Sequence, residues 1–139
     1  MTSRLGLRAV VLFALNLLVI AAVTISADLR ILPLQLVTAV PYYDKVGHFI
    51  LYGLLGFLLH IVLRYRTLKI GRVSVPYALL IIAALAMLDE FQQSFMPARS
   101  FDATDFAADM IGVLFFIGIA DYLHSRRIDG KPGPITIKP

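Results

Sequence analysis

Residues that could bind ions or transfer protons are concentrated in three short stretches of this chain. The first stretch carries Asp, His and Tyr at intervals of four residues, and the second carries two adjacent acids with a Gln close behind. The third follows an Arg with three Asp residues at intervals of three and four. Such intervals place side chains on one face of a helix. The candidates for a binding site are Asp44, Lys45, His48 and Tyr52, then Asp89, Glu90 and Gln93, and finally Arg99, Asp102, Asp105 and Asp109.

These residue types suit several kinds of chemistry. Carboxylates with an imidazole could hold a hard divalent cation or act as acid and base. Lys and Arg could bind a phosphate or carboxylate, and the acids could bind ammonium groups. The spacing matches no recognised catalytic motif, so no catalytic residue is assigned, and the absence of cysteine excludes thiolate sites. If the cofactor is a divalent metal, its ligands are expected among His48, Asp89, Glu90, Asp105 and Asp109.

Structural roles compete with these functional ones. Asp44 could cap a helix that begins there, and Asp102, with the acid three residues later, could cap the next one. A lone His48 is often an interior residue held by a hydrogen bond. The adjacent acids Asp89 and Glu90 are harder to explain in this way, because they would repel one another unless cations or protons are present.

The composition places these residues in a membrane protein. Hydrophobic residues make up 59% of the 139 residues and charged residues 16%, against about 45–50% and about 25% in soluble domains. The mean hydropathy is +0.82. The net charge of +4 comes from basic residues beside apolar segments, so we expect a lipid bilayer as the partner and no nucleic acid.

The elements that must position the candidates are apolar helices. About 20 mostly apolar residues cross the hydrocarbon core, and four segments approach this length, the third interrupted by acids after the 16 residues Val73–Leu88. We predict an all-α, four-helix integral membrane bundle with short connections. Its helices are expected at about 9–27, 46–63, 75–95 and 103–123, in a single domain over 1–139 with a cytoplasmic tail at 124–139.

Basic residues predict the orientation, because Lys and Arg favour the cytoplasmic side. Four crossings put ten of them on one side, near the N-terminus, in the 64–72 connection and in the tail, and leave only Arg30, Lys45 and Arg99 on the other. Both termini are therefore expected in the cytoplasm.

In this orientation the candidate site faces outward. Ionisable groups at membrane depth cost about 2.5–3.5 kcal/mol each on insertion scales, so they normally face the bundle interior, paired or in contact with water. We therefore expect a polar pocket that opens to the outside, with Lys45 and Arg99 offsetting Asp89, Glu90 and Asp109.

The same residues resemble the motifs of the VanZ-like family, which shows an Asp-Lys-x-x-His-x-x-x-Tyr stretch, an Asp-Glu-x-x-Gln stretch and an Arg followed by Asp and Asn/Asp-x-x-Gly. Many members have Asn where this chain has Asp109. The matching stretches here are Asp44-Lys-Val-Gly-His48, Tyr52-Gly-Leu-Leu-Gly56, Asp89-Glu-Phe-Gln-Gln93, Arg99-Ser-Phe-Asp-Ala-Thr-Asp105 and Asp109-Met-Ile-Gly112.

The resemblance implies a multi-pass protein of the bacterial cytoplasmic membrane with a link to the cell envelope, because the family is named for a protein associated with low-level teicoplanin resistance. Three functions are then expected to compete. The pocket could bind a lipid-linked envelope component or a glycopeptide antibiotic at the outer leaflet. Alternatively, the protein could be a membrane-embedded, metal-dependent enzyme on such a substrate, or a structural and partner-binding protein.

Overall fold

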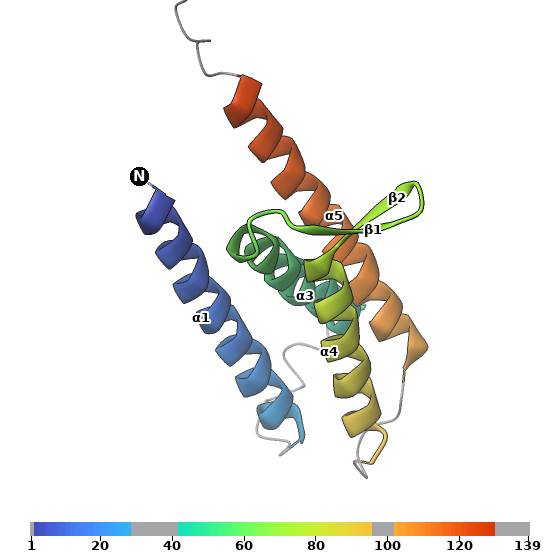
Figure 1. The fold of residues 1–139 in the computed structure, drawn as a ribbon. Helices are drawn as coiled ribbons and strands as arrows, with labels where there is room; N and C mark the ends of the chain where they lie inside the picture. The colour runs from blue at the N-terminus through green and yellow to red at the C-terminus, as the bar shows by residue number, and fades with distance from the viewer. Residues whose placement is uncertain (1, 29–41, 96–101, 130–139) are drawn as a thin grey trace, which may run out of the picture.

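The computed structural model describes residues 2–28, 42–95 and 102–129. Within these ranges the chain forms four helices and a two-stranded hairpin (Figure 1). The elements, in chain order, are α1 (Thr2–Asp28), α3 (Tyr43–Val62), β1 (Thr67–Ile70), β2 (Val73–Pro76), α4 (Tyr77–Gln93) and α5 (Ala103–Asp129).

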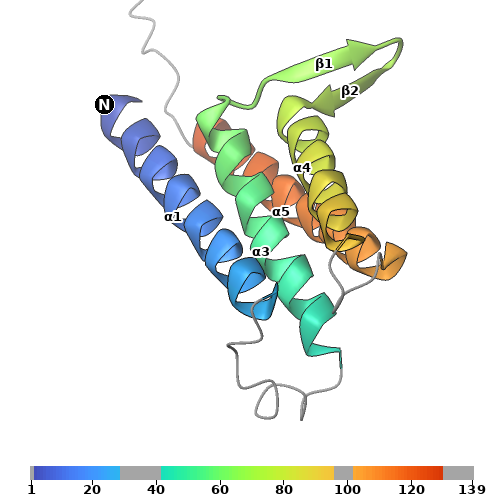
Figure 2. The same cartoon turned by 90° about the horizontal axis from the view of Figure 1, so that it is seen from below.

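Helix α3 lies at the centre of the bundle and contacts α1, α4 and α5. The hairpin, the start of α1 and the end of α5 lie at one end of the molecule, which we call the hairpin end (Figures 1 and 2). The start of α3, the end of α4 and the start of α5 lie at the opposite end, which we call the site end. Successive helices therefore run in opposite directions.

Three of the described helices are long and apolar enough to cross a membrane, within Gly6–Ser26, Tyr43–Val62 and Ala103–Arg127. Most large apolar side chains of α1 are exposed, as expected for a surface that faces lipid. The protein is thus a multi-pass membrane protein. Helix α4 has 17 residues, which at about 1.5 Å each reach about 26 Å, so only three of the four expected spans meet the length criterion.

The hairpin shortens the third apolar segment. Val73–Pro76 forms β2, antiparallel to β1, whereas the sequence pattern predicted a helix from about residue 75. Two β-branched valines favour a strand. Gly71, with a φ of 61°, allows the tight turn between the strands. Pro76 then precedes α4, because a proline cannot supply the N–H that a helix interior requires.

The last helix is longer than expected. Helix α5 continues to Asp129, so residues 124–129 are helical although the sequence pattern placed them in the tail. Residues 130–139 lie outside the described part of the chain. Arg126 and Arg127 in the last turn favour this extension, because basic side chains stabilise the negative end of the helix dipole.

Small residues let α3 and α5 approach closely. A Cβ atom at Gly112 of α5 would collide with the backbone carbonyl of Phe49 in α3, and one at Gly56 would lie 2.9 Å from Val113 Cγ1. Glycines at such positions allow close helix packing in membranes. Side chains of α3, α4 and α5 fill the core beside this contact. They are Tyr52, Leu55, Leu59, Ala78, Ile82, Ala86, Val113 and Ile117.

Helix α1 is held to α3 by a polar contact. The side-chain Nδ2 of Asn16, the strongest polar interruption of the first apolar segment, donates a hydrogen bond of 3.0 Å to the carbonyl oxygen of Leu51. Asn16 is buried, so this bond satisfies a polar group that would otherwise be costly inside the bilayer.

Candidate functional site

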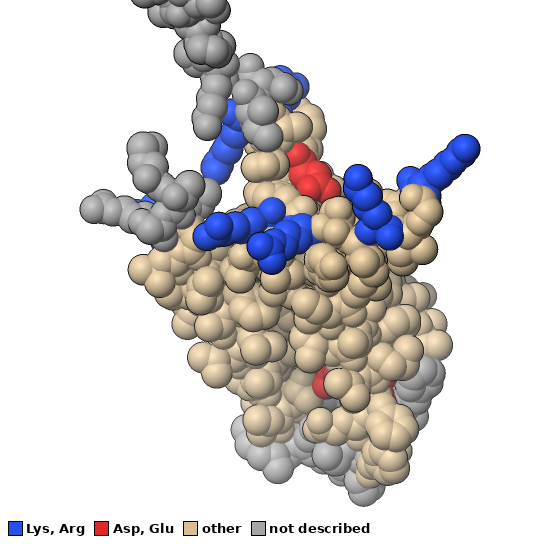
Figure 3. Space-filling model, viewed as in Figure 1, with Lys and Arg blue, Asp and Glu red and all other residues tan. Residues whose placement is uncertain are grey.

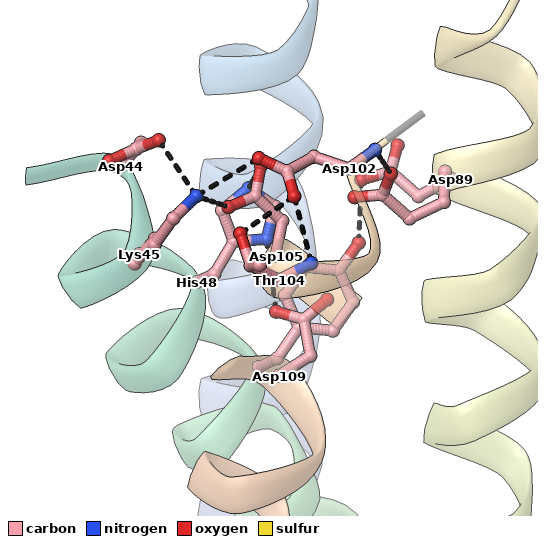
Figure 4. Close-up of polar contacts among 10 residues, drawn as sticks. Asp44, Lys45, His48, Asp89, Asp102, Thr104, Asp105 and Asp109 are labelled. Atoms are coloured by element: carbon pink, nitrogen blue, oxygen red, sulfur yellow. Dashed lines mark hydrogen bonds and ion pairs between the residues drawn. The ribbon is translucent and has the colours of Figure 1, made fainter. Parts of the chain in front are cut away.

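The three polar stretches converge at the site end of the bundle (Figure 4). The first lies on the opening turns of α3, the second on the last turns of α4, and the third at and after the start of α5. Among the predicted residues, Arg99 lies outside the described part of the chain, and Gln93 lies in α4 without a described side chain. The other nine form one network of contacts, which we call the polar cluster. Its members are Asp44, Lys45, His48, Tyr52, Asp89, Glu90, Asp102, Asp105 and Asp109.

Lys45 joins α3 to the start of α5. Its Nζ lies 2.7 Å from Asp105 Oδ1, 3.1 Å from Asp102 Oδ2 and 3.3 Å from Asp44 Oδ2 (Figure 4). Among the described residues Lys45 thus contacts Asp44, Asp102 and Asp105, whereas the sequence pattern paired Lys45 and Arg99 with Asp89, Glu90 and Asp109. The reason is position, because Lys45 lies three residues nearer the start of α3 than His48 and therefore meets the start of α5. The part of that prediction that depends on Arg99 lies outside the described residues.

His48 lies one turn deeper, between two carboxylates of α5. Its Nδ1 lies 3.0 Å from Asp109 Oδ1, and its Nε2 lies 3.9 Å from Asp105 Oδ2. Asp109 is only 1% exposed. A buried carboxylate needs a partner that donates a hydrogen bond, and the imidazole of His48 is placed to donate one when Nδ1 carries the proton.

Helix α4 joins the polar cluster through Asp89 and Glu90. The Tyr52 hydroxyl donates a hydrogen bond of 2.8 Å to Asp89 Oδ2. Glu90 Oε2 accepts a hydrogen bond of 3.0 Å from the backbone N–H of Asp102. Glu90 is 1% exposed, and its second oxygen, Oε1, has no hydrogen-bond partner among the described residues. A buried carboxylate oxygen without a partner is costly, so it is an unusual feature of this site.

The two expected helix caps, Asp102 and Asp44, have different outcomes. Asp102 caps α5, since its Oδ1 accepts hydrogen bonds from the backbone N–H of Thr104 at 2.8 Å and from the Thr104 hydroxyl at 2.6 Å. Asp44 does not cap α3: it lies in the first turn, and the cap position, Tyr42, makes no side-chain cap bond. Thr104 was not among the predicted residues, although an Asp at the N-cap position commonly accepts a hydrogen bond from the backbone N–H two residues later.

The hydrogen bonds to Asp102 also affect its acidity. The Thr104 hydroxyl and backbone N–H, followed by the Lys45 ammonium, lower the pKa of Asp102 to about 2. Asp102 is therefore a carboxylate at neutral pH and contributes negative charge to the mouth of the polar cluster.

Three groups of the polar cluster are placed to share one ion. Ligand atoms of His48, Glu90 and Asp105 all lie within 4.8 Å of one another. The other two residues of the predicted metal set have different partners, since Asp89 accepts from Tyr52 and Asp109 lies against His48. The described cluster contains six acidic side chains and one lysine, so it favours cations or ammonium groups.

A cavity of about 370 Å³ adjoins the polar cluster between α1, α3 and α4. Most of its lining is aliphatic, with Leu17 and Ile20 from α1 and Leu85 and Leu88 from α4. Tyr52 and Asp89 belong both to the polar cluster and to the wall of this cavity; the remaining lining residues are Ala21, Thr24, Ile25, Leu55 and Gln92.

A second polar group lies at the hairpin end. Buried His60 of α3 has its Nε2 2.9 Å from Asp121 Oδ1 of α5. His124 stacks on Tyr65 with ring centroids 3.9 Å apart. These contacts join the end of α3 and the residues that follow it to the last turns of α5.

The chain is thus a multi-pass helical membrane protein with an acidic, His-containing cluster at one end of its bundle. The VanZ/LLP1 family profile matches residues 5–124, and the chain therefore belongs to the VanZ/LLP1 family, as the motifs predicted. The match includes all four helices at least in part and every residue of the polar cluster. Neither the curated proteins nor the solved structures contain a significant match.

Proposed function

We propose that this protein acts from the site end on an amphiphilic ligand at the outer leaflet of the bacterial cytoplasmic membrane. The ligand class is a lipid-linked envelope component or a glycopeptide-type antibiotic. The observation that carries the proposal is the shared wall: Tyr52 and Asp89 connect the polar cluster to the aliphatic cavity. A headgroup could contact the polar cluster while an apolar chain occupies the cavity.

The distribution of charge supports an outward-facing site. Basic side chains gather at the hairpin end, as Figure 3 shows for one face of the molecule. Among the described residues, Lys45 is the basic side chain of the site end. Because basic residues favour the cytoplasmic side, this asymmetry supports cytoplasmic termini and a polar cluster near the external leaflet. The described basic residues with exposed side chains are Arg8, Arg64, Arg66, Lys69, Arg72, Arg126 and Arg127.

The chemistry of recognition follows from the cluster. Its acidic excess favours an ammonium group on the ligand, because a charge-assisted hydrogen bond to a carboxylate is about twice as strong as a neutral one. Lys45, which three carboxylates already contact, could still orient a phosphate or carboxylate at the mouth of the cluster.

Teicoplanin susceptibility tests this proposal. Bacteria that produce the wild-type protein are expected to become less susceptible. His48→Ala, Asp89→Asn and Asp105→Asn should each remove most of this effect. Each variant changes a polar-cluster residue of a different helix, α3, α4 or α5 respectively. His124→Ala is the control, since His124 lies at the hairpin end. All proteins are compared at matched membrane levels.

The outcomes separate the candidate functions. Loss of the effect in the three site variants, with the control unchanged and all proteins folded, supports the outer site. Equal effects of wild type and all variants would mean that the polar cluster is not the working site. Unfolding of every site variant would favour the structural, partner-binding alternative. If the wild-type protein does not change teicoplanin susceptibility, the antibiotic is excluded as the ligand, and a lipid-linked envelope component remains the candidate.

A further inference from the structure

We propose that His48, Glu90 and Asp105 form a binding site for one divalent cation, with Asp109 as the residue that orients the histidine. The inference rests on the proposed working site, since these residues belong to the polar cluster, but it concerns what that site holds. Three independent features of the cluster support it: the orientation of the imidazole, the buried oxygen of Glu90 and the placement of Asp105.

The imidazole of His48 has the orientation that a metal ligand needs. Its Nδ1 lies 3.0 Å from Asp109 Oδ1, so an Nδ1–H that donates to this carboxylate leaves a lone pair on Nε2. Metal-binding histidines almost always donate their other ring N–H to a carboxylate or carbonyl in this way. Asp109 is 1% exposed, and this burial restricts how the pair can move.

The Nε2 atom faces a second ligand. It lies 3.9 Å from Asp105 Oδ2, which is too long for a hydrogen bond. The distance is short enough for both atoms to contact one ion at about 2.0–2.2 Å each. The other oxygen of Asp105, Oδ1, lies 2.7 Å from Lys45 Nζ, so the lysine holds the carboxylate while Oδ2 is directed toward the histidine.

Burial of Glu90 is the observation that favours a bound cation. The residue is 1% exposed, one oxygen accepts a backbone hydrogen bond, and the other has no hydrogen-bond partner within residues 2–28, 42–95 and 102–129. Its ligand atom lies within 4.8 Å of those of His48 and Asp105. A buried, unpaired carboxylate oxygen beside other acids is costly, and a divalent cation would remove both the lost interaction and the repulsion.

The donor set indicates the kind of ion. Two carboxylates and one imidazole suit a divalent cation that accepts both oxygen and nitrogen, such as Mn²⁺ or Zn²⁺, whereas Ca²⁺ and Mg²⁺ prefer oxygen alone. Three protein ligands would leave at least one coordination position for water or for a ligand in the polar cluster.

The test is ion binding by the intact protein in mild detergent, after treatment with a chelator and removal of that chelator. Mn²⁺ is followed by electron paramagnetic resonance and Zn²⁺ by equilibrium dialysis. The wild type is expected to bind one ion per chain. His48→Ala and Glu90→Gln should each weaken binding at least about tenfold, since even residues that only orient metal ligands change affinity by about 10- to 100-fold.

The control for a lost carboxylate is Asp121→Asn, which changes an exposed acid at the hairpin end and retains an oxygen that can contact His60. Helix content, from circular dichroism, identifies variants that fail to fold. Glu90→Gln keeps the shape of the side chain and removes its charge, so we expect it to fold even if His48→Ala does not.

Each result decides the matter. One bound ion in the wild type and the control, with weaker binding in the folded site variants, supports the site. No binding of either ion at millimolar concentration, or equal binding by folded Glu90→Gln, overturns it.

Susceptibility assays separate this inference from the proposed function. Failure of ion binding with loss of the teicoplanin effect in Asp89→Asn would reject the cation and retain the function. Ion binding by the wild type without any effect on teicoplanin susceptibility would retain the cation site and reject the antibiotic-related function.

Discussion

Asp102 shows how one side chain can serve both the helix and the polar cluster. Its Oδ1 caps α5 through Thr104, and its Oδ2 contacts Lys45. Both interactions favour the charged carboxylate, which is why its pKa falls from 3.8 to about 2. A group with a lowered pKa stabilises the folded state above its unfolded pKa, and this contribution disappears as the pH falls through the folded pKa.

The pH dependence of stability should therefore change in Asp102→Asn. Asparagine keeps an oxygen for Thr104 but cannot carry charge. We expect the variant to have a lower thermal midpoint than the wild type above about pH 4. The gap should narrow as the pH falls toward 2, because protonation removes the same charge from the wild type. Circular dichroism melts in detergent across this range measure the difference, and a gap independent of pH would contradict the proposed charge contribution.

At the scale of elements, the contact between α3 and α5 positions most of the site. These two helices carry Lys45 and His48 on one side and Asp105 and Asp109 on the other. The glycine contact between Gly112 and the backbone of Phe49 lies close along the chain to His48 and Asp109. A small separation of the two helices would therefore lengthen the contacts of the polar cluster.

Gly112→Ala should disturb this contact. The added Cβ would collide with the Phe49 backbone, which cannot rotate away as a side chain could, so we expect a loss of about 1–3 kcal/mol in the free energy of unfolding. Gly118→Ala, on the same helix, is the control, because a Cβ there meets nothing within 4 Å. Alanine favours a helix interior by about 1 kcal/mol over glycine, so this control should be neutral or stabilising. Denaturation in detergent measures both, and equal behaviour would argue against the close approach.

At the scale of the whole molecule, the helices and the charges define two unlike ends. Apolar side chains cover the outside of α1, and basic side chains gather at the hairpin end (Figure 3). The antiparallel arrangement places the starts of α1 and α4 and the ends of α3 and α5 at this end (Figures 1 and 2). If the hairpin end is cytoplasmic, the polar cluster faces outward.

Introduced cysteines can test this orientation, because the chain contains none of its own. Leu68 lies on the exposed hairpin, and Ala103 is exposed at the start of α5. If the proposed orientation holds, an impermeant thiol reagent on intact cells should label Ala103→Cys and spare Leu68→Cys, because basic residues favour the cytoplasmic side. Both cysteines should react after the cells are opened. The reverse pattern in intact cells would place the polar cluster in the cytoplasm and remove the outer-leaflet ligand.

Reading the amino-acid sequence was enough to predict the membrane class, the approximate helices and the family, and to identify most of the residues that meet at the site end. These features depend on local properties, namely the length of apolar segments and the helical spacing of His48, Asp105 and their neighbours. Motif resemblance added the family for the same reason, because it compares residues in order along the chain.

Which side chains are partners could be learned only from the packing of the helices. Lys45 meets Asp105 rather than Asp89, and Glu90 is buried with one oxygen unpaired in the part of the chain that the structure describes. Spacing along a helix says which residues share a face, but the rotation and depth of each helix against its neighbours decide which faces touch. The hairpin was missed for a related reason: a short apolar segment can form a strand or a helix, and pairing with residues 67–70 made Val73–Pro76 a strand.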